Sequence, residues 1–288
     1  MPTLLITGAS GTVGAATVAA LLARRDPDLT LRLAGRDPAA LRERFGADAR
    51  VEAVALDYAD SGTFATATRG ADAAFLLGPP LDKQLDELLA PFVDHLAAAG
   101  PRRVVLLSAY GAERIGYLRR VLERARAADF DLTVLQPGFF ATNYGLYDRE
   151  SIEQRGVIYQ AAGAGRTAYV SAADVGRVAA AALTEAGHVG RTYVLTGPEL
   201  HSIAQIAGML SEIRGREVRY VAAAPEEYRA TLAAAGAPPQ VADYMLPIYA
   251  LVAEGHVAEV SDAVERITGR PPEPLRSVLE RDFAPPTA

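Results

Sequence analysis

The chain has 288 residues, 50% hydrophobic and 22% charged, a balance typical of a soluble globular protein. Its net charge of −6 argues against a nucleic-acid-binding or membrane-binding surface, and no apolar run reaches the about 18 residues that span a bilayer. The absence of cysteine excludes disulfides and thiolate chemistry, and four scattered histidines indicate no metal site. We therefore expect a cytoplasmic protein with no metal, nucleic-acid or membrane partner.

Short apolar runs alternate with helical patterns over the first half of the chain. Such runs are typical of strands buried on both faces of a parallel sheet, and we expect strands at Thr3–Thr7, Leu29–Ala34, Val51–Leu56, Ala73–Leu77, Val104–Ser108 and Leu132–Gln136. The intervening helices carry apolar stripes at three- and four-residue spacing, although Pro91 should kink or break one of them. This alternation predicts an α/β fold with a Rossmann-like, doubly wound parallel sheet.

The pattern changes after Gln136. Pro137-Gly138 breaks the chain, and the stretch to Ala168 is rich in tyrosine, glycine and polar residues, with little periodicity. One further helix is expected near Ala173–Thr184, and further strands near Thr192–Thr196 and Val218–Ala222.

The remainder of the chain is mostly helical. We therefore predict two domains. A Rossmann-like core should span residues 1–197, and a smaller, mostly helical substrate lobe should span residues 198–288, with contributions from residues 138–170.

A glycine-rich segment, Thr7-Gly8-Ala9-Ser10-Gly11-Thr12-Val13-Gly14, follows the first strand and opens the first helix. A helix N-terminus offers unpaired N–H groups and a partial positive charge to a pyrophosphate. Gly8 permits the tight turn, Gly11 lets the backbone approach the phosphates, and Gly14 lets the helix pack closely on the strand. The hydroxyl groups of Ser10 and Thr12 add donors. The GxxGxxG spacing in this position predicts a dinucleotide-binding loop.

The residues after the second and third strands bear on the choice of dinucleotide. Arg36 lies about 20 residues after Gly14, where a ribose contact falls, and its planar guanidinium suits a 2′-phosphate. Asp37 could face the ribose instead. Asp57 and Tyr58 follow the third strand, where an acidic side chain commonly meets the adenine amino group. We predict NADP(H) as the preferred cofactor, with NAD(H) as the alternative.

With these and several later motifs, the chain resembles the NmrA-like group of atypical short-chain dehydrogenases/reductases, whose members are similar to NAD(P)H quinone reductases and triphenylmethane reductases. The later motifs are the Ser108 strand end, Pro137-Gly138-Phe139-Phe140 with Asn143, Ala173-Asp174-Val175, Tyr193-Val194-Leu195-Thr196-Gly197 and Thr268-Gly269-Arg270. The resemblance implies a nicotinamide pocket lined by Leu77, Gly78, Pro79, Ser108, Ala109, Tyr110 and the turn formed by Gln136, Pro137, Gly138 and Phe139. The family often has arginine where this chain has Gln136.

The chain lacks the Tyr-x-x-x-Lys pair that most short-chain dehydrogenases use to exchange a proton with a carbonyl oxygen. Lys83 is the only lysine, and Tyr110 is followed four residues later by Arg114. Arginine stays protonated and cannot relay a proton. This favours acceptors that need little acid assistance, such as quinones, imines or iminium ions, and conjugated compounds. Tyr110 and Tyr117 are the candidate catalytic residues, and Tyr110, Phe140, Asn143 and Tyr144 are the candidate substrate pocket.

Two functions fit these observations. The first is an NADPH-dependent reductase, an oxidoreductase that transfers hydride to a small organic acceptor. The second is a non-catalytic NAD(P)-sensing regulator of the NmrA type, which the missing Tyr–Lys pair supports. A nucleotide-sugar epimerase or dehydratase is disfavoured because those enzymes rely on that pair. The aromatic stretch after Pro137 and the C-terminal lobe favour the enzyme, and the helical lobe is also compatible with a homodimer.

Overall fold

The computed structural model describes residues 1–284, and the chain divides into two compact units. The first unit comprises Met1–Pro80, Gln84–Pro137 and Ala172–Val194, and the second comprises Leu81–Lys83, Gly138–Ser171 and the chain from Leu195 onwards. Among the described residues, no helix has the length and apolar character needed to cross a membrane.

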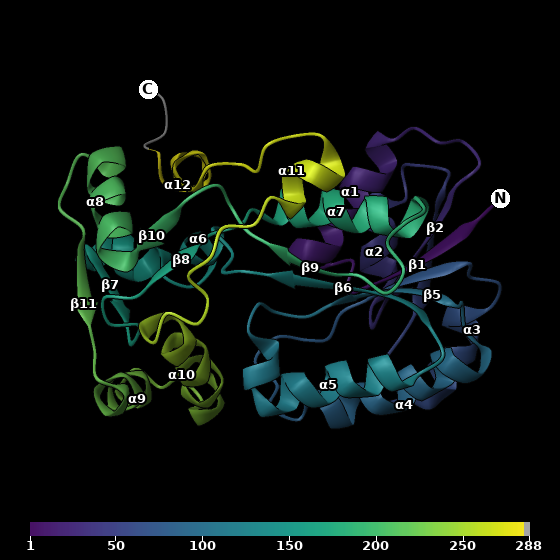
Figure 1. Ribbon diagram of the computed structural model, residues 1–288, viewed down its shortest axis with the longest axis horizontal. Coiled ribbons are helices and arrows are strands. Elements are labelled where there is room, and N and C mark those ends of the chain that lie inside the picture. Colours follow the sequence, from purple (N-terminus) through teal and green to yellow (C-terminus); the bar gives the residue numbers. More distant parts are fainter. Residues whose placement is uncertain (285–288) are drawn as a thin grey trace. The chain divides into compact units, whose positions relative to one another are not determined.

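A seven-stranded sheet forms the centre of the first unit (Figure 1). In order across the sheet, its strands are β3 (Val51–Ala55), β2 (Thr30–Gly35), β1 (Thr3–Thr7), β4 (Ala73–Leu76), β5 (Arg103–Leu107), β6 (Asp131–Pro137) and β9 (Thr192–Leu195). The strands from β3 to β6 pair in parallel, and their order is that of a Rossmann fold. The predicted doubly wound sheet is therefore confirmed, and each strand lies within one residue of its predicted bounds.

Helices cover both faces of this sheet. Figure 1 shows α1 (Thr12–Ala23) and α7 (Ala172–Thr184) on one face, and α4 (Leu85–Ala99) and α5 (Gly116–Ala127) on the other. Two more helices, α2 (Pro38–Phe45) and α3 (Phe64–Thr68), follow β2 and β3. Of the two outcomes expected at Pro91, a kink or a break, the break does not occur, because α4 is continuous there. Pro91 is exposed, and so is Glu87 one turn earlier, whose carbonyl the proline leaves without an N–H partner but within reach of water.

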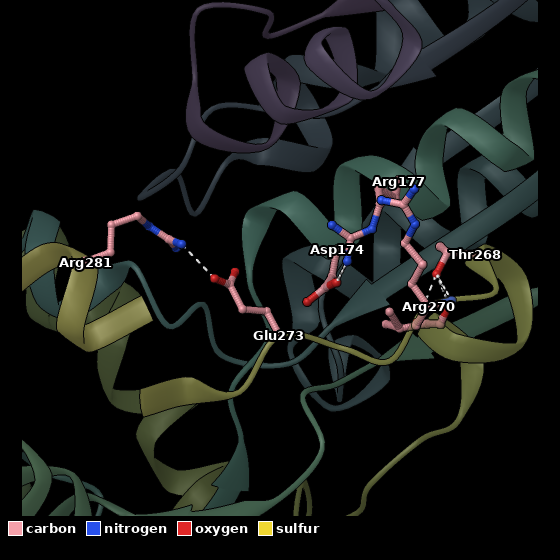
Figure 2. Close-up of polar contacts among 7 residues, drawn as sticks. Asp174, Arg177, Thr268, Arg270, Glu273 and Arg281 are labelled. Carbon is pink, nitrogen blue, oxygen red and sulfur yellow. Dashed lines mark hydrogen bonds and ion pairs between the residues drawn. The ribbon is translucent and has the colours of Figure 1, made fainter. Parts of the chain in front are cut away.

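Close packing between α1 and α7 sets the position of the first helix. A Cβ atom on Gly176 of α7 would lie 2.5 Å from the carbonyl carbon of Ala16, so only glycine allows the two helices to approach this closely. The adjacent Asp174 is 0% exposed and forms an ion pair with Arg177 one turn later (Figure 2). The Ala173-Asp174-Val175 motif therefore begins a helix that supports α1.

Two small sheets and the remaining helices make up the second unit. β7 (Val157–Gln160) pairs in parallel with β11 (Arg219–Ala222), and β8 (Arg166–Ala168) pairs antiparallel with β10 (Leu200–Ser202). The helices are α6 (Asn143–Leu146), a π-helical turn over Ser151–Arg155, α8 (Ile203–Arg214), α9 (Pro225–Ala234), α10 (Pro239–Ala253), α11 (Ala263–Thr268) and α12 (Leu275–Phe283). The stretch of weak periodicity up to Ala168 thus contains α6, β7 and β8. The predicted strand near Val218–Ala222 is confirmed as β11.

The Thr268-Gly269-Arg270 motif closes helix α11. The Thr268 hydroxyl donates to the carbonyl oxygen of Val264 at 2.7 Å. It accepts from the backbone N–H of Arg270 at 3.3 Å, and Figure 2 shows these two residues. Gly269 has a φ of +66° at the end of the helix, a common helix-ending conformation for glycine. Figure 2 also shows the ion pair, 2.6 Å long, between Glu273 and Arg281 of α12. The contacts of this motif are those of a local helix terminus.

Candidate functional site

The glycine-rich segment forms a tight turn between β1 and α1. Gly8 has a φ of +61°, a conformation that favours glycine, and its carbonyl oxygen accepts a hydrogen bond of 2.9 Å from the N–H of Gly11. A Cβ atom on Gly8 would also lie 2.5 Å from the side chain of Leu77. Ser10, Gly11 and Thr12 are exposed, whereas Val13 and Gly14 are buried. The turn therefore presents its middle residues to solvent.

The N-terminus of α1 is open to an anion. Gly11 is its N-cap residue and no side chain caps this end, whereas Asp37 caps α2 and Ser202 caps α8. The first N–H groups of α1 and its dipole can therefore act on a bound phosphate. A Cβ atom on Gly11 would meet only the carbonyl oxygen of Gly8, at 3.3 Å. Packing alone does not demand glycine there, whereas the predicted close approach of a pyrophosphate would.

Two oppositely charged residues, Arg36 and Asp37, follow β2, and only the carboxylate of Asp37 is used in a hydrogen bond within the described part of the fold. Asp37 Oδ1 accepts hydrogen bonds from the N–H groups of Ala39 and Ala40, both at 3.0 Å, and so caps α2. Arg36 is exposed and forms no hydrogen bond or ion pair with any residue from 1 to 284. Of the two residues that could face the ribose, Arg36 is therefore the one available for a charged ligand.

A second guanidinium group, which the sequence analysis missed, lies beside the glycine-rich turn. Arg44, in the last turn of α2, donates to the carbonyl oxygen of Ser10 at 2.8 Å. This contact ties α2 to the turn and adds positive charge next to the uncapped N-terminus of α1. The only sequence signal for it is a basic residue two helical turns after Arg36.

Asp57 and Tyr58 follow β3 but use their polar atoms differently. Asp57 Oδ1 accepts from the N–H of Ala59 at 3.0 Å, which leaves its second carboxylate oxygen for a ligand. The Tyr58 hydroxyl donates inward to the carbonyl oxygen of Leu77 at 2.8 Å, and its ring contacts Phe92 with centroids 5.3 Å apart. Burial raises the pKa of Tyr58. Tyr58 thus supports the end of β4 with its hydroxyl, and Leu77 is the residue it positions.

The ends of β4, β5 and β6 bring the expected nicotinamide-side residues together. These strands are parallel neighbours in the sheet, so the residues that follow them lie together at the carboxyl ends of the strands. The N–H of Ser108 donates to Leu135 at 2.8 Å, and the N–H of Tyr110 donates to Pro137 at 2.9 Å, so the segment after β5 runs beside the end of β6. In sequence order, the residues at this edge are Leu77, Gly78, Pro79, Ser108, Ala109, Tyr110, Gln136 and Pro137.

Gln136 is tied to a carboxylate in this region. It is 4% exposed, and its Nε2 donates to Oε1 of Glu113 at 2.8 Å. The same oxygen lies 3.4 Å from Arg126. The amide that replaces the family's frequent arginine therefore keeps a hydrogen-bond donor facing Glu113, but brings no charge of its own.

The two candidate catalytic tyrosines lie in different surroundings. Tyr117 is 6% exposed and belongs to the packed face of α5, whereas Tyr110 is half-buried in the segment after β5. Tyr110 is therefore the better placed of the two to meet a ligand. Lys83 lies 3.5 Å from Asp243 in an exposed ion pair of the second unit.

In the second unit, the turn after Pro137 is held by Val170. The N–H of Val170 donates to Phe139 at 2.8 Å, and the N–H of Ala141 donates to Val170 at 3.0 Å. Gly138 is needed here because a Cβ atom would lie 2.7 Å from the carbonyl oxygen of Ala168. Phe139 and Phe140 are half-buried, as is the residue at the start of α6, Asn143.

Tyr144 does not present its hydroxyl to a pocket surface. It is 2% exposed, and its hydroxyl donates to that of Tyr169 at 3.0 Å. Burial raises the pKa of both phenols. The expectation that Tyr144 walls the substrate pocket must therefore be corrected, because the tyrosine hydroxyl finds its partner inside the fold.

Near Tyr144 and Tyr169 lies an acidic group that sequence reasoning missed. Oδ2 of Asp148 accepts from Nε2 of Gln160 at 3.1 Å, and burial raises the pKa of this carboxyl to about 7. No local pattern marks it, because its neighbours come from distant elements. Within residues 1–284, no group of three or more histidine, aspartate or glutamate side chains is arranged to hold a metal ion.

Comparisons with known proteins agree with this geometry. Residues 8–186 match a protein family described as NAD(P)H-binding. The chain is 32% identical to an NAD(P)H azoreductase from Xenophilus azovorans, over 93% of each chain. It is 34% identical to a (4-alkanoyl-5-oxo-2,5-dihydrofuran-3-yl)methyl phosphate reductase from Streptomyces griseus, over 95% of each chain. An NADPH-dependent quinone oxidoreductase from Escherichia coli, solved with NADPH, shares the fold with a TM-score of 0.86 and 24% identity, covering 98% of this chain and 100% of that one.

Proposed function

Because the chain belongs to the NAD(P)H-binding family, in the NmrA-like group of atypical short-chain dehydrogenases/reductases, we propose that it reduces a small conjugated acceptor with NADPH. The expected NAD(P)(H) cofactor and oxidoreductase class are confirmed. The preference for NADPH and the class of acceptor, both predicted from the sequence, are the parts that remain proposals. The proposal also includes a cytoplasmic location, a homodimer and no nucleic-acid partner, and all three are inferred from the sequence.

The observation that carries the NADPH preference is the contrast between Arg36 and Asp37. The carboxylate caps α2, while the guanidinium is exposed and forms no hydrogen bond or ion pair within residues 1–284. In the proposed complex, Arg36 binds the 2′-phosphate and the N-terminus of α1 binds the pyrophosphate. Arg44, held on Ser10, adds positive charge beside both groups. When bound, the nicotinamide supplies the hydride.

The acceptor class is inferred from relatives and from the chain's own residues. One relative is named as an azoreductase and another as the reductase of an oxo-dihydrofuran compound. An azo group and a conjugated carbonyl compound both contain a double bond that accepts hydride. The half-buried rings of Phe139 and Phe140 suit a flat, apolar substrate of this kind. Tyr110 is the proposed polar contact, without an accompanying lysine.

The test follows cofactor absorbance while the purified protein is mixed with NADPH or NADH and a panel of acceptors. The panel contains a para-quinone, an azo dye, an acyl-substituted dihydrofuranone and an N-alkylated cyclic iminium ion. We expect oxidation that depends on the acceptor and is faster with NADPH than with NADH. Tight NADPH binding with no oxidation by any acceptor would overturn the proposal and support the alternative of a non-catalytic sensor.

A further inference from the structure

Two hydroxyl groups bind the backbone of Leu77, the residue directly after β4. The N–H of Leu77 donates to the hydroxyl oxygen of Thr7 at 3.1 Å, and its carbonyl oxygen accepts from the hydroxyl of Tyr58 at 2.8 Å. Thr7 is the last residue of β1, and Tyr58 follows β3. Side chains from two other parts of the first unit therefore fix both polar groups of this backbone position.

Thr7 alone does not hold the carbonyl group of Leu77. Its single hydroxyl proton has two possible acceptors, the carbonyl oxygen of Phe75 at 3.0 Å and that of Leu77 at 3.4 Å. The bond to Phe75 is the stronger of the two, because a hydrogen bond weakens toward the long end of its distance range. Thr7 thus ties Leu77 mainly through its N–H, and the carbonyl oxygen depends on Tyr58.

The Tyr58 ring is itself held in place by aromatic packing. Its centroid lies 5.3 Å from that of Phe92 on α4, and Phe92 packs edge-on against Phe64 on α3 at 4.9 Å. Both phenylalanines are buried. Because close-packed interiors leave little room for a ring to move, the direction of the Tyr58 hydroxyl is fixed before any ligand binds.

The side chain of Leu77 lies against the glycine-rich turn. A Cβ atom on Gly8 would lie 2.5 Å from Cδ1 of Leu77. The next residue, Gly78, is confined in the same way, because its Cβ atom would lie 2.3 Å from Cδ1 of Leu85 on α4. The segment after β4 therefore packs on the turn through Leu77 and on α4 through Gly78.

Leu77 lies where the strand order of the sheet reverses, between β1 and β4. A dinucleotide binds across this point, at the carboxyl ends of the strands. Its adenosine half then lies over β1, β2 and β3, and its nicotinamide half lies over β4 and the strands beyond. Leu77 thus follows the first strand on the nicotinamide side, whereas Tyr58 follows a strand on the adenosine side.

We propose that Tyr58 is a positioning residue for the nicotinamide half of the cofactor. Its hydroxyl fixes the carbonyl group of Leu77, and Leu77 holds the segment after β4 against the glycine-rich turn. This inference rests on the cofactor binding of the proposed function. In this role the hydroxyl acts through Leu77 and not on the cofactor, so its loss should affect NADPH and NADH equally.

The experiment compares wild type with Tyr58→Phe, which removes the hydroxyl and keeps the ring on Phe92. Isothermal titration gives the Kd of NADPH, NADH and adenosine 2′,5′-bisphosphate, a probe that carries only the adenosine half. Both dinucleotides should bind about fivefold more weakly, the equivalent of about 1 kcal/mol for one hydrogen bond, while the probe should stay within about twofold of wild type. The emission of bound NADPH, which reports the surroundings of the nicotinamide ring, should shift toward that of the free cofactor.

The matched control is Tyr193→Phe on β9. Tyr193 is buried, and its hydroxyl lies 3.0 Å from Nδ1 of His188, which precedes that strand. Both tyrosine variants should lower Tm by about 2–4 °C, because each loses one buried hydrogen bond. Tyr193→Phe should nevertheless bind all three ligands as wild type does, so a general loss of stability is separated from a loss of positioning.

A second test uses Thr7, whose side chain is 1% exposed and is not accessible to a ligand. Thr7→Ser keeps the hydroxyl for Leu77 and should bind NADPH as wild type does. Thr7→Val lacks it and should weaken both dinucleotides while sparing the adenosine probe. Unchanged dinucleotide affinity in Tyr58→Phe, or an equal loss for the probe, would overturn the inference. If wild type binds neither NADPH nor NADH, it is the proposed function that fails.

Discussion

A Cβ atom on Gly14 would lie 2.1 Å from the carbonyl oxygen of Gly8, much closer than two non-bonded atoms can approach. The first turn of α1 therefore rests directly on the turn that precedes it. On α7, Gly176 likewise permits a close approach to the backbone of Ala16, where a Cβ atom would lie 2.5 Å from the carbonyl carbon. Two missing side chains thus set where α1 begins, and with it the direction of the N–H groups proposed to bind the pyrophosphate.

Gly14→Ala should therefore damage the fold as well as the site. The added methyl group meets backbone atoms that cannot rotate away, and we expect a loss of about 1–3 kcal/mol in the free energy of unfolding, with weaker binding of both cofactors. Urea unfolding and cofactor titration measure the two effects. Gly208→Ala on α8 is the control: nothing lies within 4 Å of its Cβ position, so it should be neutral or slightly stabilising. Equal stability of the two variants would contradict the packing argument.

Gly11→Val should separate binding from stability. Gly11 has φ −82° and ψ 173°, which any residue adopts, and its Cβ position is near only one carbonyl oxygen. We expect a change of no more than about 1 kcal/mol in stability, and loss of both NADPH and NADH binding, because the valine side chain occupies the phosphate approach. Cofactor fluorescence and thermal unfolding test this pair of outcomes. Tight binding in this variant would disprove the assignment of the loop.

Arg36→Ala should discriminate between the two cofactors. Removing a charged contact to the 2′-phosphate should weaken NADPH binding by about 10- to 100-fold, while NADH, which lacks that phosphate, should bind nearly as before. Isothermal titration with each cofactor gives the comparison. Arg69→Ala is the control. Arg69 is also exposed, but it precedes β4 and therefore lies at the amino ends of the strands, opposite to the end where Arg36 lies. Equal losses for NADPH and NADH would refute the assignment of Arg36.

Asp148→Asn should change how stability depends on pH. Burial raises the pKa of this carboxyl group from 3.8 to about 7, so between these values the folded state binds more protons than the unfolded state. Its contribution to the free energy of unfolding therefore falls as pH rises from about 4 to about 7 and is constant above. The variant should gain on the order of 4 kcal/mol relative to wild type at pH 8 compared with pH 4.

Urea unfolding of both proteins at these two pH values measures that change. A stability difference between wild type and Asp148→Asn that is the same at both values would show that the carboxyl group titrates normally in the fold. This measurement needs no substrate and examines the burial of Asp148 alone.

The strands of the first unit were predictable because their signals are local. The middle of Thr3–Thr7, residues Leu4, Leu5 and Ile6, is continuously apolar because both faces of the sheet are covered, and this shows directly in the sequence. The strands β7 and β8 were not predicted. They are short, and each is paired with a strand from a distant part of the chain, β11 or β10. Nothing in their own residues records that partner.

The candidate site, too, could be predicted only where its residues answer a local demand of the backbone. The glycines of the turn were identified because a φ of +61° at Gly8 and the crowding at Gly14 are demands that few other residues can meet. Arg44 and Asp148 were missed because ordinary charged residues acquire a role only through what the fold places beside them. Here those partners are the carbonyl oxygen of Ser10 and Gln160.

By itself, then, the sequence determined the alternation of strands and helices, the dinucleotide turn and the absence of a Tyr–Lys pair, since each depends on residues close together in the chain. Only the tertiary structure decided where polar side chains point. It turned the hydroxyls of Tyr58 and Tyr144 inward, used Asp37 as a helix cap and left Arg36 exposed. Several of these contacts join elements far apart in sequence, and all depend on side-chain directions that folding sets, which no local pattern can specify.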